Sequence, residues 1–141
     1  MRSSSNLRCV YHCKIPFQGM FLPQRFHLDR LHAFSPTATF ILNLRPDKDW
    51  VHSVTHWFGL GGRFLRLFRV ENENTDRNQA LLDIYNNHTA FVRNFVRLHP
   101  SHALVEVDIS SPNAGKALSD AFSLRSESCW GKHNVNKKKP A

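Results

Sequence analysis

The sequence predicts an α/β domain in which helices cover a small parallel sheet. Strand-like and helix-like patterns alternate in the order strand, helix, long helix, strand, helix, which is typical of parallel strands joined by helical crossovers. The chain has 141 residues, of which 41% are hydrophobic and eleven are Phe, so one domain can bury a substantial core. Because a two-stranded sheet is marginal alone, the pattern further indicates part of a larger α/β domain.

Residues 1–36 form an irregular N-terminal segment in this prediction, because their apolar residues follow no clean period. Within this segment a short helix is expected near residues 25–34, ending before Ser35 and Pro36. Residues 39–44 (TFILNL) are the clearest strand. Their β-branched and aromatic content and nearly continuous apolar character predict a strand covered on both faces.

A helix is expected over residues 47–58, whose apolar face is formed by Trp50, Val54, Trp57 and Phe58. Residues 59–76 contain three glycines and a polar run. This composition predicts a loop around a short basic segment.

A longer helix is predicted over residues 77–98, ended by Pro100. A second strand (ALVEVDI) follows over residues 103–109, and a short helix over residues 113–122. The apolar face of the long helix is formed by residues spaced by four and three: Leu81, Tyr85, His88, Val92 and Phe95.

The charge of the chain favours an anionic partner. Nineteen Lys and Arg against eleven Asp and Glu give a formal charge of +8, which suits a nucleic acid, a phosphorylated cofactor or an acidic glycan. Three cysteines without paired spacing argue against a disulfide scaffold. Cys9, His12 and Cys13 lie close together, but a second ligand pair is missing, and Cys129 and His133 are four residues apart without further support, so no metal site is predicted.

The segment from Arg45 to Ser53 carries the most informative pattern. In open α/β sheets the carboxyl ends of strands line the ligand crevice, and an Arg placed there suits a phosphate. Ser53 flanks the apolar face of the following helix, so its hydroxyl is expected to converge with Arg45 on one phosphate group. In the alternative interpretation Arg45 forms a surface ion pair with Asp47 or Asp49, and Ser53 is incidental.

Arg45 and Ser53, eight residues apart after a strand, resemble the 3′-phosphate-binding motif of the sulfotransferases that use 3′-phosphoadenosine 5′-phosphosulfate (PAPS). The resemblance covers residues 37–136, the C-terminal half of such a domain, and leaves residues 137–141 as a basic tail. Further segments resemble the family in the same order, namely Tyr85-Asn-Asn-His88 with Val92, Leu104-Val-Glu-Val-Asp108, Gly115-Lys-Ala-Leu118 with Phe122, and His133-Asn134-Val-Asn136.

The chain departs from the family in two respects. The family has Arg-Asp-Pro or Arg-Asn-Pro, whereas this chain has Arg45-Pro46-Asp47. The family's phosphosulfate-binding loop of Lys, Gly and Thr or Ser is missing from the 44 residues before Arg45, and Gly59-Leu-Gly-Gly62 lacks the required ending. The resemblance therefore implies a partial three-layer P-loop-type sheet without its N-terminal phosphosulfate-loop half.

The resemblance also implies a function. An intact relative transfers a sulfuryl group from PAPS to a hydroxyl or amine acceptor, such as a carbohydrate or small molecule. Arg45 and Ser53 would then bind the 3′-phosphate of PAPS or of its product PAP, adenosine 3′,5′-bisphosphate. Catalytic residues remain unassigned, and the chain by itself is not expected to turn over. The compartment stays open between the cytoplasm and, with an N-terminal anchor, the Golgi membrane.

Other interpretations stay open beside this one. The chain is alternatively a non-catalytic remnant that binds a nucleotide or a partner subunit. A small nucleic-acid-binding protein is not expected, because no basic recognition helix and no exposed stacked aromatics are visible. His88 is either a base or ligand contact or a histidine satisfied within the core. Residues 63–69 either contact an anionic acceptor or the second phosphate of the cofactor, or form a helix or strand with a solvated basic edge.

Overall fold

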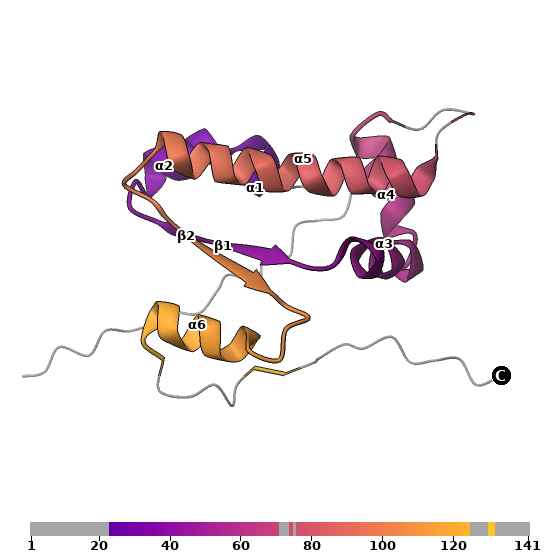
Figure 1. Cartoon of the computed structure of the whole chain (residues 1–141). Coiled ribbons are helices and arrows are strands. Elements are labelled where there is room, and N and C mark those ends of the chain that lie inside the picture. Colours follow the sequence, from indigo (N-terminus) through magenta and orange to yellow (C-terminus); the bar gives the residue numbers. More distant parts are fainter. Residues whose placement is uncertain (1–22, 71–73, 75, 125–129, 132–141) are drawn as a thin grey trace, which may run out of the picture.

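A computed structural model describes residues 23–70, 74, 76–124 and 130–131 of the chain. Figure 1 shows two strands lying between helices. In chain order the elements are α1 (Pro23–Phe26), α2 (Leu28–Phe34), β1 (Thr39–Leu44), α3 (Asp47–His56), α4 (Leu60–Leu67), α5 (Arg77–Leu98), β2 (Ala103–Asp108) and α6 (Ala114–Phe122). The described chain is therefore a mixed α/β structure, as predicted.

The sheet consists of β1 and β2, which pair in parallel from Thr39 opposite Ala103 to Leu44 opposite Asp108. Helices α3, α4 and α5 form the crossover between the two strands. In Figure 1, α5 with α1 and α2 lies on one side of the sheet and α6 on the other. The parallel pairing and the helical crossover are as predicted, although the crossover contains one helix, α4, that the predicted order lacks.

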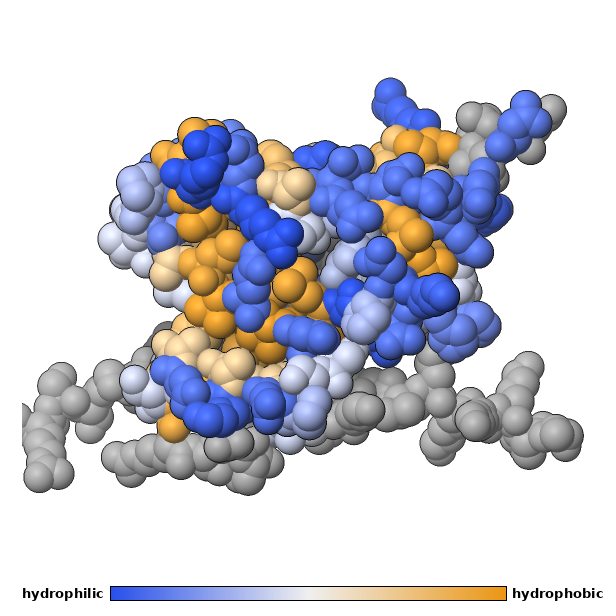
Figure 2. All heavy atoms as spheres, in the orientation of Figure 1, coloured by the Kyte–Doolittle hydropathy of each residue, from blue (hydrophilic) through white to orange (hydrophobic). Residues whose placement is uncertain are grey.

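Only one face of β1 is covered. Side chains alternate between the two faces of a strand, so Leu42 is buried while its neighbour Ile41 is 50% exposed. The prediction that this strand is covered on both faces is therefore wrong. The reason is that α6 packs on β2, where Val107 is buried, and leaves the corresponding face of β1 open. Figure 2 shows apolar surface over the sheet between α5 and α6.

Two hydrophobic clusters form the core, and α5 contributes to both. The first, the sheet cluster, lies against the sheet and α2. The second, the helix cluster, lies between α3, α4 and the first half of α5. The buried members of the sheet cluster are Leu28, Leu42, Val92 and Phe95. The buried members of the helix cluster are Val54, Leu65, Leu81 and Ile84.

The short helix expected near residues 25–34 is present in two parts, α1 and α2, with a break at His27. It ends at Phe34, as predicted before Ser35 and Pro36, and the Ser35 N–H donates to the carbonyl of Leu31. The break places Leu28 in the sheet cluster, where only 3% of it is exposed.

The loop predicted over residues 59–76 is wrong for residues 60–67, which form α4. Leu65 is fully buried and Phe64 packs against the helix cluster, so an apolar stripe stabilises the helix despite its glycines. Gly61 is buried against α5, where an added Cβ would lie 3.4 Å from the Leu81 side chain, an ordinary van der Waals distance. Gly59 has a left-handed φ of +70° and makes the turn from α3 into α4.

Helix α3 ends at His56, two residues before its predicted end, so Trp57 and Phe58 are 53% and 87% exposed instead of buried. Helix α5 has the predicted bounds. Its first turn is capped by Asp76, whose Oδ1 accepts the backbone N–H groups of Asn78 and Gln79 at 3.0 and 3.2 Å. Among the described helices none combines the length and the apolar character that a bilayer span requires.

Candidate functional site

Arg45 directly follows β1 at the carboxyl end of the parallel sheet, and its backbone is held by the long helix. The Tyr85 hydroxyl on α5 accepts the Arg45 N–H at 2.9 Å and donates to the Arg45 carbonyl at 3.2 Å. Pro46 follows and restricts Arg45 to extended geometry, after which α3 begins at Asp47. The strand end and the start of α3 are thus fixed by one side chain from α5.

The guanidinium of Arg45 lacks a partner in the described part of the chain. Its Nε is buried and makes no hydrogen bond. The alternative interpretation of a surface ion pair is not supported there, because neither Asp47 nor Asp49 forms a salt bridge with Arg45. A buried charged donor without an acceptor is costly, and such a group is typical of a place where an anion binds.

Ser53 lies on α3, one residue before the buried Val54 and three residues after Trp50. It is half-buried, and within the described residues its hydroxyl makes no hydrogen bond. Arg45 therefore lies at the end of β1 and Ser53 on α3, the next element, and both side chains carry a polar group that makes no hydrogen bond within the described residues. It shows no hydrogen bond between them.

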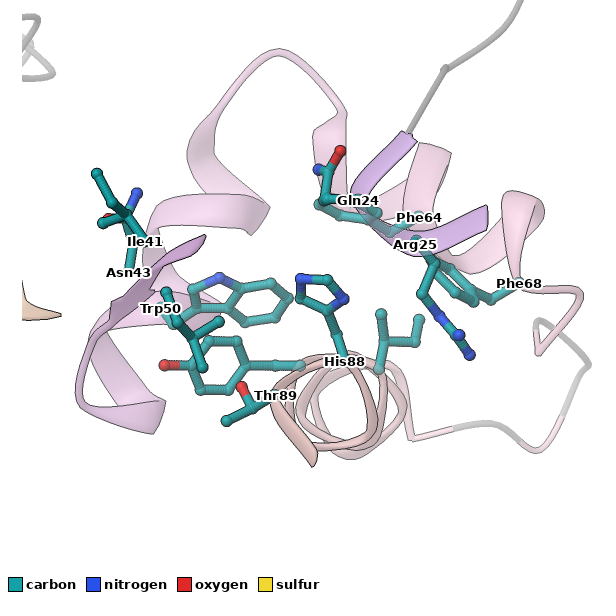
Figure 3. A pocket seen from close by; sticks show the side chains of 12 residues that line it. Gln24, Arg25, Ile41, Asn43, Trp50, Phe64, Phe68, His88 and Thr89 are labelled. Carbon is teal, nitrogen blue, oxygen red and sulfur yellow. The ribbon is translucent and has the colours of Figure 1, made fainter. Parts of the chain in front are cut away.

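A pocket of about 290 Å³ lies where α5 meets β1, α3, α4 and α1. It lies between the sheet cluster and the helix cluster, and we call it the aromatic pocket. Figure 3 shows its lining side chains. These are Gln24, Arg25, Ile41, Leu42, Asn43, Trp50, Phe64, Phe68, Ile84, Tyr85, His88 and Thr89.

Aromatic rings form one side of this pocket. The Trp50 indole stacks on the Tyr85 ring with centroids 4.8 Å apart and planes inclined by 28°. The centroid of the Phe64 ring lies 6.1 Å from that of Trp50. The same Tyr85 therefore supports Trp50 with its ring and Arg45 with its hydroxyl, which couples the pocket wall to the end of the strand.

Two polar groups of α5 line the pocket without a hydrogen-bond partner in the described part of the chain. Thr89 is only 7% exposed and its Oγ1 is unsatisfied, and the Nδ1 of His88 is likewise buried and unsatisfied. Burial, together with the nearby charge of Arg25, lowers the pKa of His88 below its usual value of 6.5. His88 is therefore neutral at neutral pH.

Arg25 is the charged residue of the pocket lining. Its guanidinium lies 4.7 Å from the Phe91 ring centroid and 5.8 Å from that of Phe68, which are cation–π distances. In Figure 3 this group lies on the far side of the pocket from Trp50 and Asn43. The part of the pocket near Trp50 is thus lined by uncharged groups.

A pair of histidines, His32 and His102, shows how a buried imidazole is normally satisfied. His102 is 6% exposed, donates from Nδ1 to the Ala38 carbonyl at 3.0 Å, and has Nε2 3.0 Å from Nδ1 of His32. His88 lacks such partners at its Nδ1. The sequence leaves a core role and a ligand contact open for His88, and its unsatisfied Nδ1 in a pocket favours the ligand contact.

The sequence indicates Arg45 and Ser53 but does not predict the aromatic pocket. It places Trp50 and Tyr85 on apolar helix faces, and it predicts a loop where α4 carries Phe64. Thr89 has no signal in the sequence that separates it from other polar helix residues. The pocket exists only because four helices and a strand converge, which no single segment specifies.

Several residues of the sequence motifs lie outside the described part of the chain: Cys9, His12, Cys13, Cys129, His133, Asn134 and residues 137–141. Within the part that is described, no group of three His, Cys, Asp or Glu side chains is arranged to hold a metal ion. In the basic segment, Arg66 is exposed on α4, and Arg63 donates to the Phe58 carbonyl at 2.7 Å.

Comparison with known proteins gives no further assignment. No protein-family model matches the chain, and neither curated proteins nor solved structures give a significant match. Function is therefore inferred from the geometry of the Arg45 site and of the aromatic pocket.

Proposed function

We propose that this chain is the nucleotide-binding, C-terminal half of a PAPS-dependent sulfotransferase domain, and that Arg45 and Ser53 bind the 3′-phosphate of PAPS or PAP. The observation that carries the proposal is the buried, unpartnered Nε of Arg45 at the carboxyl end of a parallel strand. The parallel pair with its helical crossover is compatible with a larger P-loop-type sheet, to which we assign it.

In this assignment the binding groups are prepared before the ligand arrives. Tyr85 holds the backbone of Arg45 at both its N–H and its carbonyl, so little freedom is lost there on binding. A phosphate oxygen would accept from the guanidinium fork, and the hydroxyl of Ser53 would donate to the same group. The net charge of +8 favours the approach of this anion.

Transfer of the sulfuryl group would require more than these two residues. The reaction depends on positioning and on stabilising the charge that develops on the leaving oxygen. In an intact relative the acceptor would be a hydroxyl or amine of a carbohydrate or small molecule. This chain is expected to bind the nucleotide without transferring sulfate, and the non-catalytic remnant is the alternative. A sulfate-transfer assay of this chain, first alone and then with a sulfotransferase N-terminal half added, distinguishes a sulfotransferase half from a non-catalytic remnant.

The direct test is calorimetric titration of the full chain with PAP and with 5′-AMP, which lacks the 3′-phosphate. We expect PAP to bind at least about tenfold more tightly than 5′-AMP, because charge-assisted hydrogen bonds contribute about 1.5–3 kcal/mol. Arg45→Ala should remove this preference, and Ser53→Ala should reduce it by a smaller factor. Arg97→Ala is the matched control, since Arg97 is exposed at the end of α5 and bonds to Asn94.

Equal affinity for PAP and 5′-AMP, or an unchanged preference in Arg45→Ala, would remove the assignment. Circular dichroism of each variant checks that it is folded. A loss of PAP preference in Arg97→Ala as well would indicate that the nucleotide is attracted by the general positive charge and not by the Arg45 site.

A further inference from the structure

Three buried side-chain polar atoms of the described residues make no hydrogen bond, namely Arg45 Nε, His88 Nδ1 and Thr89 Oγ1. His88 and Thr89 both line the aromatic pocket, whereas Arg45 does not. Tyr85 bonds to the backbone of Arg45, and the other two residues follow Tyr85 within about one turn of α5. Native proteins satisfy nearly all buried polar groups, so a concentration of exceptions beside a pocket indicates a ligand that is not part of the chain. Arg45 is accounted for by the phosphate, whereas His88 and Thr89 are not.

The size and walls of the aromatic pocket define the shape of this ligand. A dry cavity of ~150 Å³ holds one benzene ring, and the pocket of about 290 Å³ therefore has room for two fused rings. Trp50 and Phe64 provide aromatic surface, and Ile84 and Leu42 provide aliphatic surface. Pockets of this kind bind mostly through apolar contact, with a few polar groups setting the orientation.

The polar groups of the pocket define the chemistry of the ligand. Thr89 Oγ1 both donates and accepts, and a neutral His88 has one ring nitrogen that accepts. A hydroxyl group offers one donor and an acceptor, so it satisfies both residues at once. Among the described residues no acidic side chain lines the pocket, and Arg25 already engages two Phe rings on the far side from Trp50.

We propose that the aromatic pocket is a binding site for a neutral, planar compound of two fused rings that bears one hydroxyl group. The hydroxyl lies against Thr89 and His88, and the rings lie against Trp50 and Phe64. The site is separate from the proposed phosphate site in chemistry, since it requires no charge on the ligand. It does not depend on Arg45 or Ser53.

The test uses three probes of matched ring size: 2-naphthol, naphthalene and 2-naphthoate. The full chain is titrated calorimetrically with 2-naphthol and 2-naphthoate, and naphthalene is measured by displacement of bound 2-naphthol. We expect 2-naphthol to bind about thirtyfold more tightly than naphthalene, because its hydroxyl makes two hydrogen bonds and each contributes about 1 kcal/mol net, and also more tightly than 2-naphthoate.

Thr89→Val is the most informative variant. Because Thr89 Oγ1 has no partner in the described residues, this nearly isosteric change should leave the melting temperature unchanged or higher. It should reduce the preference for 2-naphthol over naphthalene to about fivefold, because only the hydrogen bond to His88 remains. Thr55→Val is the matched control, because Thr55 is exposed on α3 and outside the aromatic pocket, and it should keep the full preference.

The proposal is wrong if 2-naphthol and naphthalene bind equally well, if 2-naphthoate binds most tightly, or if no saturable binding is seen. Titration of the same variants with PAP keeps the two proposals distinct. Thr89→Val should retain its preference for PAP over 5′-AMP, and Arg45→Ala should retain its preference for 2-naphthol. A loss of both preferences in one variant would contradict the separation of the two sites.

Discussion

The two halves of α5 pack against different hydrophobic clusters, and the residues between the two halves carry polar groups instead. The first half buries Leu81 and Ile84 in the helix cluster, and the second half buries Val92 and Phe95 in the sheet cluster. Between them, residues 85–89 carry a tyrosine hydroxyl, an imidazole and a threonine hydroxyl at the edge of the aromatic pocket. The two ends of α5 thus stabilise the fold by apolar packing, while the helical turn between them carries the side chains that can make polar contacts.

The largest expected effect comes from removing apolar volume from one cluster. Leu65→Ala in α4 should lower the free energy of unfolding by about 2–5 kcal/mol, because Leu65 is 0% exposed and its loss leaves a cavity. Leu28→Ala, 3% exposed in the sheet cluster, should have a similar effect. Urea denaturation followed by circular dichroism measures both.

This pair of variants tests whether the two clusters are one cooperative unit. Since α5 runs through both, each variant should shift a single transition without splitting it. Leu98→Ala is the control, since Leu98 is 58% exposed at the end of α5 and should change stability little. Two separate transitions in either variant would show that the clusters unfold independently.

The difference between long and short apolar stripes explains which parts of the fold are predictable from the sequence. Helix α5 is predicted with its bounds because its apolar period of four and three is sustained from Leu81 to Phe95 and Pro100 ends the helix. Helix α4 is not predicted, because its glycine-rich composition outweighs a single apolar stripe in eight residues, and packing against Leu81 stabilises it. The open face of β1 is not predicted either, because apolar side chains occur on both faces and their pattern does not report which face is covered.

The candidate site is likewise predictable only where it depends on a local feature of the sequence. Arg45 can be placed because a strand end is a local feature of the sequence. The hydrogen bonds from Tyr85 to Arg45 join residues 40 positions apart, and no spacing rule predicts them. The aromatic pocket depends on the angle at which α4 meets α5, so it cannot be predicted from a sequence in which α4 reads as a loop.

A smaller effect is expected from the hydroxyl that joins the middle of α5 to the strand end. Tyr85→Phe removes both hydrogen bonds to the Arg45 backbone while keeping the ring that stacks on Trp50. It should lower the free energy of unfolding by about 1–3 kcal/mol, since each hydrogen bond contributes about 0.5–1.5 kcal/mol. It should also weaken binding of PAP severalfold, because Arg45 is then less well positioned. Chemical denaturation and calorimetric titration measure the two quantities.

Phe91→Leu is the matched comparison for Tyr85→Phe, because it alters an aromatic residue of the same helix that packs against the sheet cluster and makes no hydrogen bond to Arg45. Phe91→Leu should lower stability without changing the ratio of PAP to 5′-AMP affinity. If Tyr85→Phe destabilises the chain and leaves PAP binding intact, the hydroxyl has a structural role alone and does not position Arg45.

The smallest effect concerns the protonation of His88. Its pKa is lowered by burial and by the charge of Arg25, so below pH 6.5 the unfolded chain binds a proton that the folded chain resists. This residue therefore makes the free energy of unfolding fall as the pH drops below 6.5 and has little influence above that value. His88→Leu should flatten the pH dependence between about pH 7.5 and about pH 5.5.

The control for His88→Leu is Asn87→Leu, at the exposed neighbouring position on α5, which should leave the slope as in the original chain. Denaturation curves recorded across this pH range test the difference between the two variants. An equal slope in both would show that His88 takes up its proton as readily in the folded chain as in the unfolded one. The imidazole would then be open to solvent, and its place as a neutral acceptor in the aromatic pocket would be lost.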